Sequence, residues 1–208
     1  MASDRRRRPA RGRRTPREEE TTVSDPTTGR GPIDPYEHLP QVPSFSLTSD
    51  DVTEGERLPD RSASGAMGVD GGEDASPQLS WSGAPEGTKS FAVTVYDPDA
   101  PTASGFWHWA VADLPASTTS LPRGAASGGL PQEAVVLRND GGFEGFVGAA
   151  PPPGHRTHHY WVVVHAVDVE SLGVEAGAPS AQLGFALFTH TLGRATLVAT
   201  YDLPAQDA

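Results

Sequence analysis

Residues 159–167 read HYWVVVHAV, and two earlier stretches have the same character, SFAVTVY at 90–96 and WHWAVADL at 107–114. All three are rich in β-branched and aromatic residues and lie between clusters of proline and glycine. This pattern is typical of strands that are at least partly buried. The sequence therefore predicts a protein built around these three strands.

The rest of the chain adds two further strands. Phe45 and Leu47 alternate with polar residues, and an acidic, Gly-rich loop then runs to Pro77 without helical spacing. Residues 195–201 form the last expected strand. With helix confined to short pieces, the predicted fold class is all-β, a sandwich or sheet with small helical additions.

One helix is expected near the C-terminus. Ser180 follows a proline and is a candidate N-cap, and the helix should end near Gly193. The face of this helix would carry Leu183, Ala186, Leu187 and His190.

Length and composition exclude several classes of protein. The 208 residues fit one ordinary domain, and glycine and proline make 43 of them, about a fifth, which suits a turn-rich β protein. Because the chain has no cysteine, a disulfide framework, thiol catalysis and zinc sites with sulfur ligands are excluded.

Two observations bear on location. No run approaches the roughly 18 apolar residues of a membrane span, so no integral membrane contact is predicted. The arginines of residues 5–14 resemble the start of a signal peptide, but Pro16 and the glutamates at 18–20 follow where an apolar stretch should stand. We therefore expect a cytoplasmic protein.

Charge divides the chain into two parts. Residues 1–38 carry nine arginines against seven acids, whereas residues 39–208 carry seven basic residues against twenty acids, a net charge of −13. The first part is poor in apolar residues, so we expect a disordered, Arg-rich, low-complexity tail. The second part should form the folded domain, and its acidic surface would repel phosphate backbones, so no nucleic-acid partner is expected for it.

Four histidines fall between residues 155 and 165. Alternation along a strand places His158 and Tyr160 on one face, and His159, Trp161 and His165 on the other.

The same rule places Phe106 and His108 opposite Trp107 and Trp109. If the two strands are neighbours, the side chains of His108, His158 and Tyr160 converge on one point. These groups supply N–H and O–H donors, and a nearby carboxylate would raise the histidine pKa toward the charged form. The cluster therefore suits an anion.

A carboxylate and two stiff segments accompany this cluster. Asp97 directly follows the first strand in the segment DPDAP, residues 97–101, whose two prolines restrict the backbone. The segment GAAPPPG, residues 148–154, precedes His158 and is stiffened in the same way. Rigid loops beside polar side chains suit a preformed pocket for a small molecule.

Three longer runs carry a resemblance to a known family. They are YDPDAPTASGFWHWAVADLPAS at 96–117, GFVGAAPPPGHRTHHYWVVVHAVD at 145–168 and GFALFTHTLGRATLVATYDL at 184–203. Over about residues 44–202 the chain resembles the phosphatidylethanolamine-binding protein (PEBP) family, specifically its bacterial and archaeal Raf kinase inhibitor-like branch. The resemblance implies a β-sandwich around a large antiparallel sheet, with short C-terminal helices and a small anion pocket at one end.

The resemblance also implies the residues of the site. The ligand-binding residues carried over are Asp97, Phe106, His108, Val147, Gly148, Ala150, Pro151, Pro152, His158 and Tyr160.

Two positions depart from the family pattern. The family's His-Arg-Tyr motif reads His158-His159-Tyr160, so an ion pair made by that arginine is not expected to carry over unchanged. The Gly-rich loop reads GEDASP at 72–77, without the family's asparagine before Ser-Pro.

The residues also allow other interpretations of the cluster. In the first alternative, the cluster is a buried polar network that rigidifies one end of the sheet and binds no ligand. Zinc binding by His155, His158, His159 and His165 is a further alternative, although neighbouring strand positions point to opposite faces. A small hydrolase is the third, although the chain has no G-x-S-x-G elbow and no evident oxyanion hole.

We therefore expect a binding protein that is not an enzyme and needs no metal or cofactor. Its expected ligand is a small phosphorylated or carboxylate group, and the resemblance implies a role as an inhibitor of a kinase or a serine protease.

Overall fold

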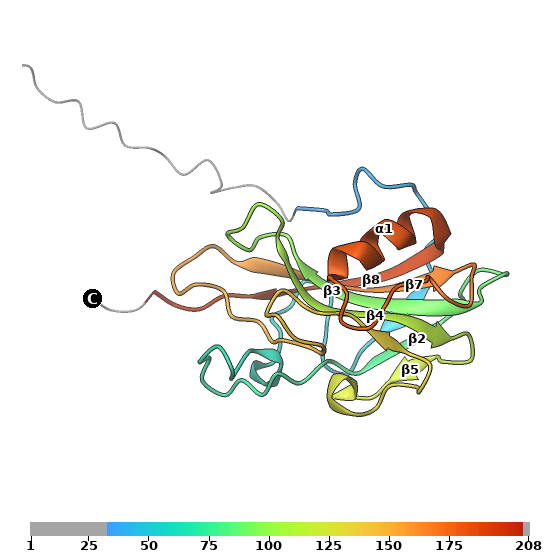
Figure 1. The fold of residues 1–208 in the computed structure, drawn as a ribbon. Coiled ribbons are helices and arrows are strands. Elements are labelled where there is room, and N and C mark those ends of the chain that lie inside the picture. Colours follow the sequence, from blue (N-terminus) through green and yellow to red (C-terminus); the bar gives the residue numbers. More distant parts are fainter. Residues whose placement is uncertain (1–32, 206–208) are drawn as a thin grey trace, which may run out of the picture. The chain divides into compact units, whose positions relative to one another are not determined.

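A computed structural model describes residues 33–205 of the chain, so residues 1–32 of the predicted tail lie outside the described residues. The larger of its two sheets has five strands in the order β6-β4-β3-β7-β8, and every neighbouring pair is antiparallel (Figure 1). These strands are β6 (Val135–Val136), β4 (Phe106–Pro115), β3 (Ser90–Asp97), β7 (His158–Val167) and β8 (Thr191–Tyr201). The three segments that predicted the fold thus form the middle of this sheet.

The smaller sheet is also antiparallel and lies below the larger one in Figure 1. It has the order β1-β2-β5, with β1 (Ser46–Thr48), β2 (Leu79–Ser82) and β5 (Ser120–Leu121). Two 3₁₀ turns, η1 (Asp60–Ser62) and η2 (Ala125–Ser127), lie in the connecting loops. The prediction of an all-β sandwich is confirmed.

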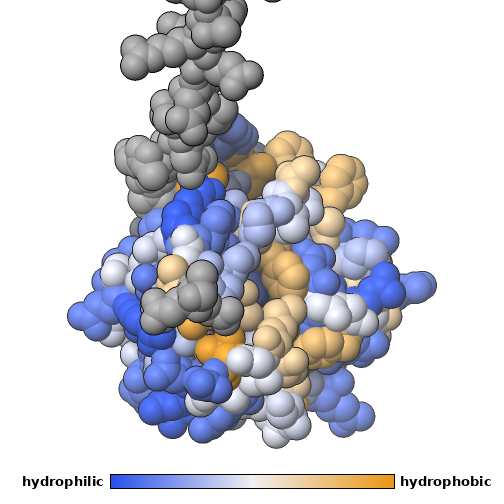
Figure 2. Space-filling view, turned by 90° about the vertical axis from the view of Figure 1, so that its left-hand side faces the viewer, coloured by the Kyte–Doolittle hydropathy of each residue, from blue (hydrophilic) through white to orange (hydrophobic). Residues whose placement is uncertain are grey.

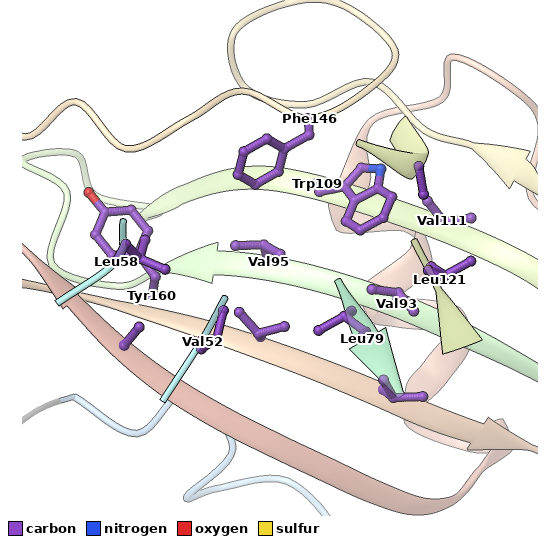
Figure 3. Packing of buried hydrophobic residues seen from close by; sticks show 14 of the residues in the cluster. Val52, Leu58, Leu79, Val93, Val95, Trp109, Val111, Leu121, Phe146 and Tyr160 are labelled. Carbon is purple, nitrogen blue, oxygen red and sulfur yellow. The ribbon is translucent and has the colours of Figure 1, made fainter. Parts of the chain in front are cut away.

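The main core lies between the two sheets. Val93, Val95 and Trp109 of the large sheet pack with Leu79 and Leu121 of the small one, and all five are almost completely buried (Figure 3). Full burial of a side chain of this size contributes about 1.5–3 kcal/mol. This cluster therefore holds the sheets together and fixes which face of β3, β4 and β7 looks inward.

The opposite face of the large sheet is covered by α1 (Ser180–His190) (Figure 1). Leu183 and Leu187 of the helix pack against small residues of β3 and β4, namely Ala92, Ala110 and Ala112. Valines on the sandwich face thus alternate with alanines on the helix face, which allows the helix to approach closely.

The ends of α1 differ in detail from the prediction. Ser180 is the first helical residue, and its hydroxyl donates to the carbonyl of Arg138 at 2.9 Å instead of capping the helix. The helix ends at His190, and Gly193 already belongs to β8. A Cβ atom at Gly193 would come within 3.0 Å of Pro85, so close packing explains this glycine.

A bulge in β4 corrects the predicted alternation. Val95 pairs with Trp109 and the next residue, Tyr96, pairs with Trp107, so His108 is an extra residue in β4. Trp109 therefore lies in the sandwich core on the same side as His108, whereas Trp107 packs against Tyr96. The prediction that Trp109 faces away from His108 is wrong, because strict alternation fails at a bulge.

Residues 33–38, which composition grouped with the tail, are described by the structure. The ring of Tyr36 lies 6.0 Å from that of Trp161 and 5.9 Å from that of His165, on the α1 side of the sheet. Within residues 33–205 no helix has both the length and the hydrophobicity needed to cross a bilayer.

Candidate functional site

A cavity of about 230 Å³ opens at the end of the large sheet where β3 stops and β4 and β7 begin. Its lining includes all of the predicted site residues except Val147 and Gly148. Four lining residues were not in the predicted set, namely Met67, Ala100, Pro101 and Thr102.

Strand register explains why these distant residues meet. In the antiparallel pairing, Asp97 at the end of β3 lies opposite Phe106 at the start of β4. The start of β7 lies on the other side of β3, since Tyr96 pairs with Trp161. The central position of β3 thus places its terminal carboxylate between the first residues of both neighbours.

Asp97 and His158 form a buried pair beneath the cavity. The Nδ1–H of His158 donates to Oδ2 of Asp97 at 2.6 Å, and both side chains are at most 3% exposed. The other carboxylate oxygen accepts the backbone N–H groups of Asp99 at 2.7 Å and Ala100 at 3.1 Å. With both oxygens occupied, Asp97 fixes the orientation of the His158 ring, and Nε2 is the ring nitrogen that Asp97 does not engage.

Nε2 of His158 meets a second imidazole. Nδ1 of His155 lies 2.7 Å away, and the two rings are arranged edge to face with centroids 4.9 Å apart. His155 is exposed and follows the rigid segment 148–154, whereas His158 is buried. The exposed imidazole therefore covers the hydrogen-bonding atom of the buried one.

His108 approaches the cavity from β4. Its Nδ1–H donates to the carbonyl of Val147 at 2.8 Å, so Nε2 is the nitrogen available to a ligand. Burial lowers the pKa of His108 despite the opposing effects of the Val147 carbonyl and of Asp97. Burial thus outweighs the predicted upward effect of the nearby carboxylate, and the lowered pKa favours the neutral ring near pH 7.

Tyr160 and Phe106 complete the ring cluster around His108. The rings of Tyr160 and His108 meet edge to face with centroids 5.0 Å apart, and the ring centroid of Phe106 lies 4.7 Å from that of His108. Burial raises the pKa of Tyr160, so its hydroxyl remains a proton donor at physiological pH. Figure 3 shows this hydroxyl at the edge of the core cluster, directed away from Trp109.

Val147 and Gly148 stand behind the lining and position it. The carbonyl of Val147 accepts from the His108 ring, and the backbone N–H of Val147 donates to the backbone carbonyl of His108 at 3.0 Å. Gly148 packs so tightly on the backbone of Ala63 and Ser64 that a Cβ atom would come closer than 3.0 Å. These residues therefore act through the ones they support.

Asp74 connects the Gly-rich loop to this support, a role that sequence reasoning missed. Its carboxylate accepts the N–H groups of Gly148 at 2.7 Å and Ala66 at 3.1 Å, which brings Met67 to the cavity. Although burial opposes it, these two bonds lower the pKa of Asp74. Asp74 has a positive φ of 50°, a conformation that nothing in its sequence neighbourhood predicts.

His159, which stands where the family has an arginine, and the loop residue Arg156 both contact Asp99. Asp99 is 3% exposed and accepts from Nδ1 of His159 at 2.7 Å and from the guanidinium of Arg156 at 3.0 Å. Arg156 lies three positions before His159, in the loop instead of the strand. The ion pair of Arg156 with Asp99, together with the bond from His159, ties the 97–101 segment to the start of β7.

The histidines between 155 and 165 do not converge on one metal position. His155 and His158 contact each other, His159 binds Asp99, and His165 lies on the α1 side beside Tyr36. In the part of the chain that the structure describes, no three His, Asp or Glu side chains are grouped as a metal site.

The mouth of the site lies at the end of the molecule shown in Figure 2. Apolar residues occupy the middle of that face and strongly hydrophilic residues border it. Pro151 is buried and Pro152 is exposed, so the proline-rich loop forms part of the rim.

Comparison with known proteins agrees with this architecture. The family model of the phosphatidylethanolamine-binding proteins matches residues 48–202. The protein YbhB of Escherichia coli is 47% identical over 159 residues, which are 76% of this chain and 99% of YbhB. The crystal structure of E. coli YbcL, described as a member of the mammalian PEBP family, matches with a TM-score of 0.74 at 44% identity and covers 77% of this chain and 99% of that one.

A more distant structure shares the fold alone. The phosphatidylethanolamine-binding protein of Plasmodium vivax matches with a TM-score of 0.51 at 12% identity, over 84% of this chain and 91% of that chain. The sandwich and its end pocket define a β-rich binding protein. The chain belongs to the phosphatidylethanolamine-binding protein family.

Proposed function

We propose that the end pocket binds a phosphoryl or carboxylate group, carried by a small ligand or by a side chain of a partner protein. The observation that carries this proposal is the convergence of His108, His158 and Tyr160 on one cavity above Asp97. Two ring nitrogens and a hydroxyl would donate hydrogen bonds to the anion, and charge-assisted bonds of this kind are the stronger ones.

Proton uptake would accompany binding. Nδ1 of His108 is already engaged, so this ring can donate to an anion only by protonation at Nε2. Because burial lowers the pKa of His108, the empty pocket holds this ring neutral, and an anion would raise that pKa. The affinity for anions should therefore increase as the pH falls.

The size of the pocket limits the ligand. About 230 Å³ accommodates a head group such as phosphoethanolamine but not a whole phospholipid. Capture of an anionic side chain of a kinase or a serine protease would be the route by which such a protein inhibits either enzyme. The proposed role is binding without turnover.

Calorimetric titration with phosphoethanolamine at pH 6.0 and pH 8.0 tests the proposal. The wild type should bind more tightly at the lower pH, and His158→Ala should weaken binding at least about tenfold, the loss of roughly one charge-assisted bond. Tyr160→Phe removes only a hydroxyl and provides a second test, since His158→Ala leaves Asp97 without its partner. His190→Ala, which removes a histidine bonded to Asp168 outside the pocket, is the matched control.

Equal affinity of wild type, His158→Ala and Tyr160→Phe would reject the pocket. Hydrolysis of esters or phosphoesters by the wild type, lost in His158→Ala, would instead favour the hydrolase alternative.

A further inference from the structure

A second cavity lies on the other face of the large sheet, beneath α1. Its volume is about 250 Å³, and its walls come from the segment around Tyr36, from β3, β4, β7 and β8, and from α1. Since the end pocket opens on the sandwich side of the same sheet, the two cavities have no lining residue in common.

The walls of this cavity are mainly apolar and aromatic. Tyr36 and Trp107 line it, together with Leu187 and Phe188 of α1. Phe188 remains 53% exposed although it contributes to the wall. A flat or chain-like apolar group would bury part of this surface.

One strong charge accompanies these walls. Arg194 of β8 lines the cavity, is partly buried, and stacks its guanidinium 4.9 Å from the centre of the Tyr36 ring. Its single hydrogen bond to a described residue is a 3.2 Å contact with the carbonyl of Pro40. Among residues 33–205 no carboxylate lies within 4.0 Å of it, although Asp34 is near enough to act on its charge.

Among the described residues, none in contact with the guanidinium of Arg194 is a carboxylate. His165, its partner in the β7–β8 register, is a neutral ring because burial lowers its pKa to about 3. Burial also lowers the pKa of Arg194 itself, which shows that its charge is partly desolvated. A partly desolvated guanidinium without a carboxylate is an unfavourable arrangement that a bound anion would relieve.

We infer that this cavity is a second ligand site, which takes a small organic acid with an aromatic or aliphatic body. The carboxylate pairs with Arg194, and the body inserts between Tyr36, Trp107 and α1. The volume is slightly below the usual range of drug-sized pockets, about 300–1,000 Å³, so the ligand is a molecule of about ten to twelve non-hydrogen atoms.

The probe for this site is 3-phenylpropanoate, with 3-phenylpropan-1-ol and acetate as comparators that lack the charge or the body. Titrations are followed by the indole N–H signal of Trp107 in NMR spectra, with phosphate present in excess to occupy the end pocket. The wild type should bind the acid saturably with a dissociation constant of about 1 mM or lower, as expected for a ligand of this size. The alcohol should bind at least about tenfold more weakly, and acetate weaker still.

Two variants alter the site in different ways. Arg194→Gln removes the charge and should weaken binding of the acid about tenfold. Gly184→Leu should abolish binding, because a Cβ atom at this helical position lies 3.7 Å from the Trp107 ring and a longer side chain fills the cavity. A wild-type-like spectrum away from α1 shows that each variant is folded.

Two controls separate this site from the surface and from the end pocket. Phe185→Ala changes an 84% exposed residue of the same helix and should leave binding unchanged. His158→Ala should also leave it unchanged, so the result is independent of the proposed function of the end pocket. The inference is overturned if the wild type shows no saturable binding, if the alcohol binds as well as the acid, or if Arg194→Gln and Gly184→Leu bind like the wild type.

Discussion

His155 and His158 share one hydrogen bond at the mouth of the end pocket. The Nδ1–Nε2 distance of 2.7 Å requires one proton between the two nitrogens, and Nδ1 of His158 is held by Asp97. An incoming anion can therefore accept from Nε2 of His158 only after the exposed ring has moved away and Nε2 itself carries a proton. His155 competes with the ligand for this atom, although alternation along β7 gave no reason to place it there.

Replacing His155 by alanine should strengthen phosphate binding at pH 8. The ligand-free protein would no longer have a hydrogen bond to break, and a net bond of about 1 kcal/mol corresponds to about a fivefold gain in affinity. Calorimetry on His155→Ala measures this, with the exposed neighbour Thr157→Ala as the control. A weaker affinity in His155→Ala would show that this ring donates to the anion instead.

Two loops rather than single strands give the end pocket its shape. The 97–101 segment is tied to β7 by Asp99, which holds both Arg156 and His159. The 148–154 segment is tied to the Gly-rich loop by Asp74 and by the close contact of Gly148 with Ala63. These cross-links join loops that are far apart in the sequence, and they stiffen the rim more than the prolines alone would.

Two glycine substitutions compare this packing with that of α1. Gly148→Ala should lower the free energy of unfolding by about 2 kcal/mol or more, because its methyl group would overlap the backbone of Ala63 and Ser64. Gly184→Ala should be neutral or stabilising by up to ~1 kcal/mol, since its methyl group meets no atom closer than 3.7 Å and alanine favours helix. Urea unfolding measures both values, and equal stability of the two variants would contradict the assigned packing.

The whole molecule is organised by the two faces of its large sheet. The sandwich face carries the main core and, at one end, the proposed anion pocket. The other face carries α1, the buried His165 and the second cavity. Because His165 is buried as a neutral ring, the free energy of unfolding depends on pH.

Acid should therefore destabilise the protein partly through His165. Its pKa is about 3 in the folded protein and about 6.5 when unfolded, so the unfolded state binds more protons between these values and stability falls as the pH drops below about 6.5. Between pH 7 and pH 4.5 the wild type should lose about 2–3 kcal/mol more than His165→Phe. Urea unfolding of both proteins at the two pH values tests this, and parallel losses would contradict it.

Local pattern alone identified much of the architecture. The β-branched and aromatic residues of 90–96, 107–114 and 159–167 indicated the central strands, and alternation along the last of them placed His158 and Tyr160 on one face. A single strand determines these features, because side chains alternate whatever the strand pairs with. The family motifs then indicated which end of the sheet carries the pocket.

The tertiary structure alone decided the features that depend on register and on contacts between distant loops. The bulge at His108 moved Trp109 to the sandwich side, the carbonyl of Val147 set the tautomer of His108, and Arg156 of the preceding loop joined His159 on Asp99. Each of these three features depends on the exact register between two strands or on the position of one loop relative to another. A sequence read along one strand contains no measure of that displacement, so these features become visible only when the whole chain is folded.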